Sequence, residues 1–473
     1  MAATRSAWAA SLLALLFRTR AQVHVMAPES LVSTFKASNG TIEGSTATFG
    51  APFYGDRVLG LLQYAKSKGK KHCEESDYDI PLGEYKQDSD GKGKLINIIM
   101  VDRGDCSFTT KVKVAAVKGA HAVIIVDRSD SQLDLRSIIV ADDGQGSDIK
   151  IPSVLISHKA GKDLIQAINA GNQVIVELAW KAPADHTVQT DLWMSSASQE
   201  SQKFLKDFAK KRRALNRLVS FTPHYAVFSI SNVDDSTADN LCHPEDRSGA
   251  KAIEKGEFCA EDPDGPGPVN GKDVLDEDVR QLCIHQLYKV MSEAPKPVEY
   301  SEQFWHYIES FPDRCPLSKF GKACSENLMH EVNIDKEKVD KCVLVNGTKM
   351  LEEQRDHPAW SPRALRVNGW RYSGTMDADL VTRAICSGFI ELPGECKDLI
   401  KPRDPTQPYT GDQRQSVTFG TLIGWLFGTV ALAAVALLLY KRYLKKEMQR
   451  SLREEVMLEV QAQIGDYIQM QGK

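Results

Sequence analysis

The chain of 473 residues is too long for one ordinary domain and long enough for two or three. Its 59 basic and 63 acidic residues give a formal net charge of -4, and this near balance argues against nucleic-acid binding, which needs a strong basic excess. A mean hydropathy of -0.32 excludes a polytopic membrane protein. The 42% of hydrophobic and 26% of charged residues are typical of folded globular material.

The first 21 residues have the pattern of a secretory signal peptide. Arg5 supplies a short positive region, and Ala7–Phe17 is an apolar run too short to span a bilayer. Cleavage after Ala21 fits the pattern, although Arg18 and Arg20 leave the position open. The alternative, a buried helix, suits the extreme N-terminus poorly.

Residues 22–182 alternate predicted strands with predicted helices. Continuous runs of Val and Ile indicate strands that are covered on both faces, as in an α/β domain. The turn Asp102–Asp105 follows the first of these strands. The predicted strands are 95–101, 122–126, 151–156 and 174–180, and the predicted helices are Phe108–Ala120 and His158–Ala170, ended by Gly119 and Gly171.

Residues 185–400 form a second, cysteine-rich unit with eight of the ten cysteines. The number of cysteines is even and no CxxC pair occurs, so zinc ribbons and dithiol redox sites have no support. Dispersed, even cysteines predict structural disulfides formed in an oxidising compartment. In the same unit, Leu365–Gly374 predicts two short strands around an Asn-Gly turn, which indicates an α+β fold.

Val417–Tyr440 is free of charge over 24 residues and predicts a transmembrane helix. Four basic residues follow within 441–446, so the positive-inside rule places the tail, 441–473, in the cytosol. The expected topology is therefore type I, with residues 22–416 in the lumen and 401–416 as a stalk.

Three glycines of this helix, Gly420, Gly424 and Gly428, repeat every fourth residue and share one face. Such a face allows close approach of a second helix, so a homodimer through the transmembrane helix is one expectation. The alternative is that glycine is simply common in membrane helices.

The cytosolic tail predicts a helix that ends at Gly465-Asp466 and is followed by a sorting signal. Tyr467, Ile468, Gln469 and Met470 form a tyrosine, two residues and a bulky apolar residue. Clathrin adaptor complexes bind such a motif in extended form, as an added strand with pockets for the two anchoring side chains. The alternative is that these residues form the last turn of an amphipathic helix.

Several segments together resemble a known family. Met100–Phe108 resembles the most telling segment of protease-associated (PA) domains. More narrowly, the chain is similar to the plant-type vacuolar sorting receptors, and the likeness covers most of residues 30–396. The further segments that carry it are Ala47–Gly55, Cys73–Ile80, Ile151–Ser157, Phe221–Tyr225, Phe258–Pro263, Asn270–Val274, Arg280–Cys283, Arg314–Pro316, Lys338–Cys342 and Ile385–Phe389.

The resemblance implies a PA-like domain over 22–182, a thioredoxin-like second domain and a disulfide between Cys73 and Cys106. It also implies that an Arg-Gly-Asp-Cys loop contacts a cargo peptide. The cargo-binding residues are then Arg103, Gly104, Asp105, Cys106, Ser107 and Phe108. Arginine offers five donors, glycine permits close backbone approach and a disulfide would hold the loop rigid. The alternative is a mere tight turn capped by Asp105.

The sequence departs from the family in three places. The family's closely spaced cysteine pair after Trp193 is missing, which counts against thiol redox activity. Epidermal-growth-factor-like repeats are absent before the membrane, so calcium dependence is not carried over. Asp127-Arg128 replaces an acidic pair, so cargo preference is expected to differ.

No catalytic residue, metal site or cofactor is predicted, because the sequence shows no GxSxG, HExxH, Walker or kinase motif.

We expect a glycosylated receptor, with sequons at Asn39 and Asn346, that sorts soluble lumenal proteins from the Golgi to a vacuole or lysosome-like compartment. Its expected location is Golgi, trans-Golgi and prevacuolar or endosomal membranes. We also expect release of cargo between about pH 7 and pH 5 through histidines near the Arg103 loop, with His121 as the candidate. The alternatives are a membrane-anchored PA-domain peptidase or redox protein, and an adhesion protein.

Overall fold

The computed structural model describes residues 21–80, 95–132, 134, 138–246, 252–292, 297–411 and 419–471. The chain divides into two units, Met1–Asp412 and Gln413–Lys473. The expected signal peptide lies outside the described residues except for Ala21, which is the first residue of a strand.

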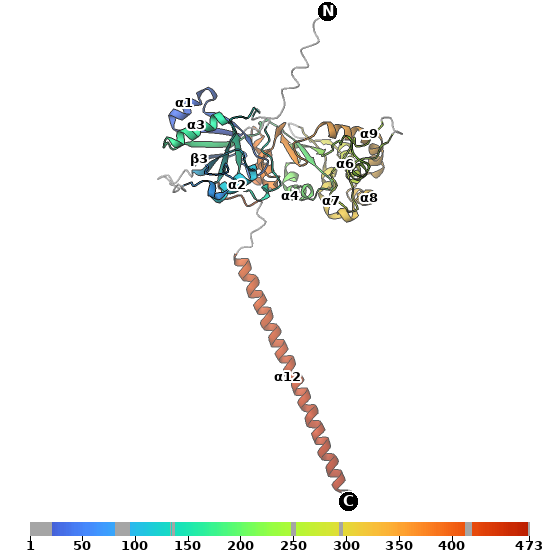
Figure 1. Cartoon of the computed structure of the whole chain (residues 1–473). Coiled ribbons are helices and arrows are strands. Elements are labelled where there is room, and N and C mark those ends of the chain that lie inside the picture. Colours follow the sequence, from blue (N-terminus) through green and yellow to red (C-terminus); the bar gives the residue numbers. More distant parts are fainter. Residues whose placement is uncertain are drawn as a thin grey trace, which may run out of the picture. The chain divides into compact units, whose positions relative to one another are not determined.

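Seven strands of the first unit close into a barrel in the order β1-β2-β6-β5-β4-β3-β7 (Figure 1). Strands β3, β4, β5 and β6 run parallel to one another, whereas β1, β2 and β7 complete the barrel through antiparallel pairs. The strands are β1 (Ala21–Ala27), β2 (Thr41–Thr46), β3 (Arg57–Gln63), β4 (Ile96–Asp102), β5 (Ala122–Val126), β6 (Ser153–Ile156) and β7 (Ile175–Trp180).

The predicted α/β character of this region is confirmed, and the strands are covered on both faces. Ile98 and Met100 of β4 point into the barrel core. The alternate residues Ile99 and Val101 pack outside it, in a cluster that includes Val112 of α2 (Phe108–Val117). α1 (Glu29–Thr34) and α3 (His158–Asn169) are the other helices of this part. The side chains of Ser107 and Ser157 cap α2 and α3 by accepting backbone N–H bonds, which fixes where each helix starts.

A second sheet has the strand order β13-β12-β8-β9. Its strands are β8 (Val188–Met194), β9 (Val219–Tyr225), β12 (Ala364–Val367) and β13 (Trp370–Arg371), and a separate pair is formed by β10 (Val290–Met291) and β11 (Glu299–Tyr300). The hairpin predicted around Asn368 and Gly369 is present, with φ of 49° and 76° at these residues. Positive φ at both central positions suits an Asn-Gly turn.

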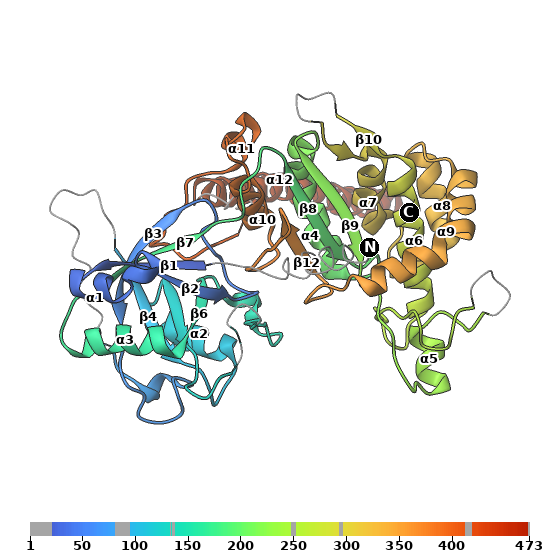
Figure 2. The same ribbon diagram turned by 90° about the horizontal axis from the view of Figure 1, so that it is seen from above.

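Helices pack against this second sheet, and Figure 2 shows α6, α7, α8 and α9 grouped on the side of β9, with α8 and α9 farther out. The helices are α4 (Gln199–Leu215), α5 (Asp235–Leu241), α6 (Gly271–Leu287), α7 (Glu302–Arg314), α8 (Lys322–Glu331), α9 (Lys336–Asp356), α10 (Ala378–Ser387) and α11 (Gly394–Leu399).

All ten cysteines are paired, as the even count predicts. The five disulfides are Cys73–Cys106, Cys242–Cys259, Cys283–Cys342, Cys315–Cys324 and Cys386–Cys396.

Residues 401–411 differ from the expected stalk, because they belong to the first unit and pack against its other residues. The Arg403 guanidinium lies 3.9 Å from the Phe53 ring centroid and donates 2.9 Å to the Ala51 carbonyl oxygen. Tyr409 donates to the Asp377 carboxylate. An arginine, an aromatic ring and their partners therefore anchor a segment whose composition alone indicates a linker. Residues 412–416 lie outside the described residues.

The second unit contains one helix, α12 (Phe419–Gln471). Within the described residues, the stretch Phe427–Leu458 is long and apolar enough to cross a membrane, with a mean hydropathy of 1.4. The prediction that the tail helix ends at Gly465 is wrong, since α12 continues through it. One glycine costs only about 1 kcal/mol in a helix interior, which is too little to end a long helix.

Candidate functional site

The six residues of the predicted cargo loop lie together where β4 ends and α2 begins. Parallel strands β4 and β5 bring this loop beside Asp127, which directly follows β5. A second loop, residues 66–78, covers it from the region after β3. Carboxyl ends of parallel strands are common ligand sites because their loops converge there.

Arg103 is the cationic side chain of the loop between β4 and α2. Its Nη1 donates 2.9 Å to the Asp127 Oδ1, and its guanidinium carbon lies 5.4 Å from the Phe108 ring centroid. The side chain is 23% exposed, against 4% for Asp127. The side chain is thus held in place by a buried carboxylate and an aromatic ring while part of it faces solvent.

Gly104 and Asp105 turn the chain through left-handed backbone, with φ of 128° and 67°. A Cβ on Gly104 would lie 3.1 Å from the Lys71 Nζ, at the end of a side chain that can move, so it is the positive φ that favours glycine here. The Asp105 carboxylate accepts a 3.2 Å bond from the Lys71 N–H. Asp105 therefore joins the Arg103 loop to the 66–78 loop, rather than capping only its own turn.

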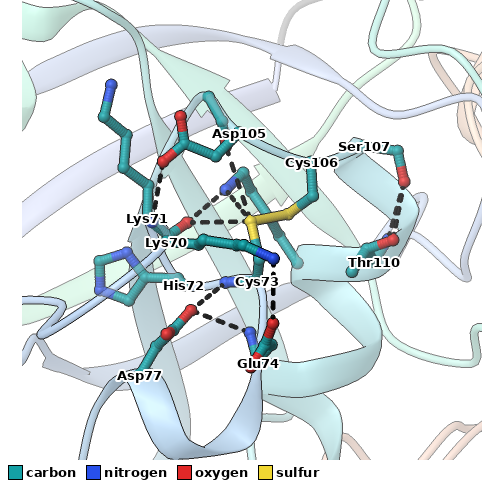
Figure 3. The surroundings of a disulfide bond; sticks show 12 residues. Lys70, Lys71, His72, Cys73, Glu74, Asp77, Asp105, Cys106, Ser107 and Thr110 are labelled. Atoms are coloured by element: carbon teal, nitrogen blue, oxygen red, sulfur yellow. Dashed lines mark hydrogen bonds and ion pairs between the residues drawn. A yellow bond between two sulfur atoms is a disulfide. The ribbon is translucent and has the colours of Figure 1, made fainter.

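The disulfide Cys73–Cys106 is the second tie between these loops, and it is the pairing that the family resemblance implied. Figure 3 shows Lys71, His72 and Asp105 around it. Asp77 accepts from the backbone N–H groups of Cys73 and Glu74, at 2.8 and 3.0 Å, and so fixes the Cys73 side of the bridge.

Ser107 and Phe108 start helix α2. The Ser107 Oγ accepts 3.2 Å from the Thr110 N–H and lies 2.9 Å from the Thr109 Oγ1. Thr109 in turn donates 2.7 Å to Asp143. The first turn of α2 is thereby fixed by two hydroxyl groups and a carboxylate, with Phe108 half-buried beneath Arg103.

Lys111 is a member of this site that the sequence analysis missed. Its side chain is fully buried, and its Nζ donates to the Lys71 carbonyl oxygen and lies 3.6 Å from the Cys73 Sγ. Burial lowers the pKa of Lys111 to about 8, although Asp105 and Asp102 act against this. Its position in the helix could have indicated that it is buried, since Lys111 shares the buried face of α2 with Val112 and Ala115.

His72 is the histidine next to the loop, and its ring is buried. Its Nε2 lies 2.9 Å from the Ala65 carbonyl oxygen, which only accepts, so Nε2 carries the proton. Its Nδ1 accepts 3.2 Å from the Asp102 N–H, and burial lowers the pKa of His72. A neutral ring therefore supports the end of β4.

His121, the histidine singled out from the sequence, lies elsewhere. It precedes β5 and its N–H donates 2.8 Å to the Asn97 carbonyl oxygen near the start of β4. Because β4 and β5 are parallel, this is the edge opposite Arg103. The expectation that His121 neighbours the loop is wrong.

The other predicted sites are scattered. Asn39 is exposed in a turn with φ of 53°, whereas Asn346 lies inside α9 with its Nδ2 3.9 Å from the Cys342 Sγ. Tyr467, Ile468, Gln469 and Met470 are helical residues of α12. Within the described residues, no group of three or more His, Cys, Asp or Glu residues is arranged to hold a metal ion.

The place of the missing cysteine pair holds serines and a buried acid. Trp193 ends β8 with Met194, and Ser196 lies between this strand and α4. The Ser196 N–H donates 3.1 Å to Asp278 of α6, and burial raises the pKa of Asp278 to about 8. This carboxyl group is therefore kept largely neutral at pH 7.

Comparison with known proteins now identifies both parts of the first unit. Residues 58–164 match the PA domain, and residues 188–386 match the vacuolar sorting receptor thioredoxin-like domain. The chain therefore contains a PA domain and a domain that matches the thioredoxin-like domain of vacuolar sorting receptors. The resemblance seen in the sequence is confirmed, as is the thioredoxin-like fold of the second domain.

The similar curated proteins include vacuolar-sorting receptor 4 of Arabidopsis thaliana, 32% identical over 78% of this chain and 59% of that protein. Vacuolar-sorting receptor 1 of Pisum sativum is 31% identical over 76% of this chain and 59% of its own length. The chain thus spans less than two thirds of these relatives.

Other similarities cover single domains. A probable lipoprotein aminopeptidase of Mycobacterium tuberculosis is 32% identical over 30% of this chain and 26% of that protein. Among solved structures, an aminopeptidase from Aneurinibacillus covers 34% of this chain and 31% of its own, at 21% identity and a TM-score of 0.22. DsbA from Mycobacterium tuberculosis covers 45% of this chain and 87% of its own, at 13% identity and a TM-score of 0.27.

Proposed function

We propose that this protein is a cargo receptor without catalytic activity, which binds soluble lumenal proteins and sorts them from the Golgi to a vacuole or lysosome-like compartment. It would span the membrane once, with type I topology. The proposal is supported by the two family domains and by relatives that are named vacuolar-sorting receptors. The observation that carries it is the Arg103 loop, which presents a cation on a rigid support.

The loop suits recognition of an extended peptide for three reasons. Arg103 is held by Asp127 and Phe108, so little side-chain freedom is lost on binding. Gly104 permits close approach of a peptide backbone, since it has no side chain. The Cys73–Cys106 bond and the Asp105 contact fix both neighbouring loops. A guanidinium so placed can donate to peptide carbonyl oxygens or to a carboxylate.

Replacing Arg103 by alanine is expected to weaken cargo binding about 10- to 100-fold, as loss of hydrogen bonds to a charged group implies. The full chain would first be used to capture proteins from a lumenal extract, and the most enriched protein would then be titrated against both variants. Arg57→Ala is the matched control, because Arg57 is 62% exposed, pairs with Glu177 and starts β3, at the edge of the sheet opposite Arg103. Equal affinities of the wild type and the Arg103 variant would remove the loop from the binding site.

The same titration measures the expected pH dependence. Binding is expected to fall between about pH 7 and pH 5. His72 is now the histidine to vary, since protonation of its Nδ1 would break the bond from the Asp102 N–H beneath the loop. Burial holds its pKa below the usual 6.5, so the loss lies toward the acidic end of this range.

For the tail, we propose recruitment of clathrin adaptor complexes through Tyr467 and Met470. Adaptors bind such motifs as an extended strand, so the last turn of α12 would have to unwind first. Tyr467→Ala combined with Met470→Ala is expected to shift the steady-state location of the protein away from Golgi and endosomal membranes. Ile468→Ala with Gln469→Ala is the control at the two spacer positions. An unchanged location with unchanged adaptor binding would show that the motif is incidental.

A further inference from the structure

A buried lysine, Lys111, lies beside the Cys73–Cys106 disulfide and has no part in the proposed binding of cargo. Lysine side chains usually run along apolar surface and keep the ammonium group in water. The Lys111 amine is instead buried, 3.6 Å from the Cys73 Sγ, on the side of the disulfide that faces the start of α2. A cation at this distance stabilises the thiolate that forms when the disulfide opens.

The two cysteine residues differ in their exposure to solvent. Cys73 is only 8% exposed, whereas Cys106 is half-buried on the more open side of the bridge. An incoming thiolate therefore reaches the Cys106 Sγ more readily. Attack there makes Cys73 the leaving group, and this is the sulfur beside Lys111. Exchange is faster when the leaving thiol has a low pKa.

The backbone just before each cysteine has a conformation that the disulfide helps to hold, so opening the bond would release it. Each cysteine is preceded by a non-glycine residue in left-handed conformation, His72 with φ of 62° and Asp105 with φ of 67°. Such residues persist where their surroundings hold them in place. The disulfide is one of the contacts that hold them here, together with the Asp105–Lys71 bond.

We propose that Cys73–Cys106 is a thiol–disulfide exchange site, attacked at Cys106 by a dithiol reductant and assisted by Lys111, and that its opening releases the Arg103–Asp105 loop. In the first step, a thiolate of the dithiol bonds to the Cys106 Sγ while the electron pair of the broken S–S bond goes to the Cys73 Sγ. In the second step, the other thiol of the reductant loses its proton and attacks its own half of the mixed disulfide. Cys106 leaves as a thiolate. Both cysteines then take up a proton, and the dithiol becomes a disulfide.

The charged groups around Lys111 set the strength of this assistance. The carboxylates of Asp105, Asp102 and Asp77 favour the charged form of Lys111 and raise its pKa, whereas Lys71 lowers it. In the described structure the Lys111 amine donates to none of these carboxylates, and its contacts are the Lys71 carbonyl oxygen and the Cys73 Sγ. The ammonium group therefore remains directed at the sulfur.

The test measures the rate at which each of the five disulfides opens. The full chain in detergent would be incubated with dithiothreitol at pH 7, quenched by alkylation at a series of times and mapped by mass spectrometry. Cys315–Cys324 is the matched control bond, because Cys315 is buried, Cys324 is half-buried and the described structure gives neither sulfur a lysine contact. We expect Cys73–Cys106 to open about tenfold faster than this control.

Two variants distinguish the effect of the Lys111–Cys73 contact from a general effect of positive charge on α2. Lys111→Met should slow opening of Cys73–Cys106 about tenfold and leave the other four bonds unchanged. Lys113→Met removes a charge from the same helix without touching a sulfur and should have no effect. Trypsin should cut after Arg103 only once the bond is open, which reports release of the loop whether or not that loop binds cargo.

The proposal is overturned if Cys73–Cys106 opens with or after the control bond, or if Lys111→Met opens it at the wild-type rate. It is equally overturned if Arg103 stays resistant to trypsin after the bond has opened. Should Lys111→Met unfold the chain, seen as simultaneous opening of all five bonds, the wild-type order of opening and the trypsin result decide.

Discussion

Glu277→Ala is expected to lower the free energy of unfolding of the thioredoxin-like domain by about 3–5 kcal/mol. Glu277 is fully buried in α6 and accepts from four groups: Tyr307 at 2.8 Å, Gln281 at 2.9 Å, Ser325 at 2.6 Å and the Arg280 guanidinium. Removing it leaves Arg280, which is 8% exposed, as a buried cation without its carboxylate. An unpaired buried charge costs far more than the lost contact itself.

Thermal unfolding of the purified chain with intact disulfides measures this effect. For a domain of this size, a loss of 3–5 kcal/mol corresponds to about 10 °C in Tm. Asp276→Ala is the matched control on the same helix, since Asp276 is 44% exposed and pairs with Lys272 at the surface. Such pairs contribute about 0–1 kcal/mol, so the control should unfold close to the wild type. Equal Tm values for Glu277→Ala and Asp276→Ala would show that the network contributes little.

The sequence predicts the local elements of this fold well, because neighbouring residues determine them. β5 was predicted at Ala122–Val126, where it lies, and the ends of α2 and α3 fall near Gly119 and Gly171, which have positive φ. The closure of the barrel was not predicted. It depends on β1 pairing with both β2 and β7, and the pair with β7 joins residues about 150 positions apart. No local pattern of side chains encodes that distance.

The residues of the candidate site likewise fall into those that the sequence predicts and those that only the fold brings together. The six residues 103–108 are contiguous, so a sequence motif finds them together. Asp127 and the 66–78 loop reach the site only through the parallel order of β3, β4 and β5. His121 shows the corresponding error: it is near Arg103 in sequence, but a parallel strand starts at the opposite edge of the sheet from where its neighbour ends. Lys111 can be predicted as a site residue only by noting that its position in the helix places it on the buried face of α2.

Asp278→Asn is expected to remove much of the pH dependence of the stability of the thioredoxin-like domain. Asp278 of α6 is buried, its Oδ1 accepts from the Ser196 N–H at 3.1 Å, and its Oδ2 has no hydrogen-bond partner in the described structure. Burial raises its pKa from the usual 3.8 to about 8, and the nearby Glu277 adds to the rise. The acid is therefore protonated in the folded chain at pH values where it is ionised in the unfolded chain.

The direction of the effect follows from this difference. Between about pH 4 and pH 8 the folded state binds a proton that the unfolded state has released, so the stability of the wild type falls as the pH rises through this range. Asparagine is neutral throughout and has nearly the same shape. The two proteins should therefore unfold at similar temperatures at pH 4, and the variant should be more stable by a few kcal/mol at pH 8, since each unit of pKa shift corresponds to about 1.4 kcal/mol.

Melting curves of wild type, Asp278→Asn and Asp276→Asn at half-unit steps from pH 4 to pH 8 measure this difference. The exposed Asp276 serves as the control, and its variant should follow the wild-type profile. Parallel profiles for the wild type and Asp278→Asn would mean that Asp278 is ionised in the folded chain, with water or another group reaching its Oδ2. A convergence of the profiles at low pH would instead place a neutral carboxylic acid beneath Ser196.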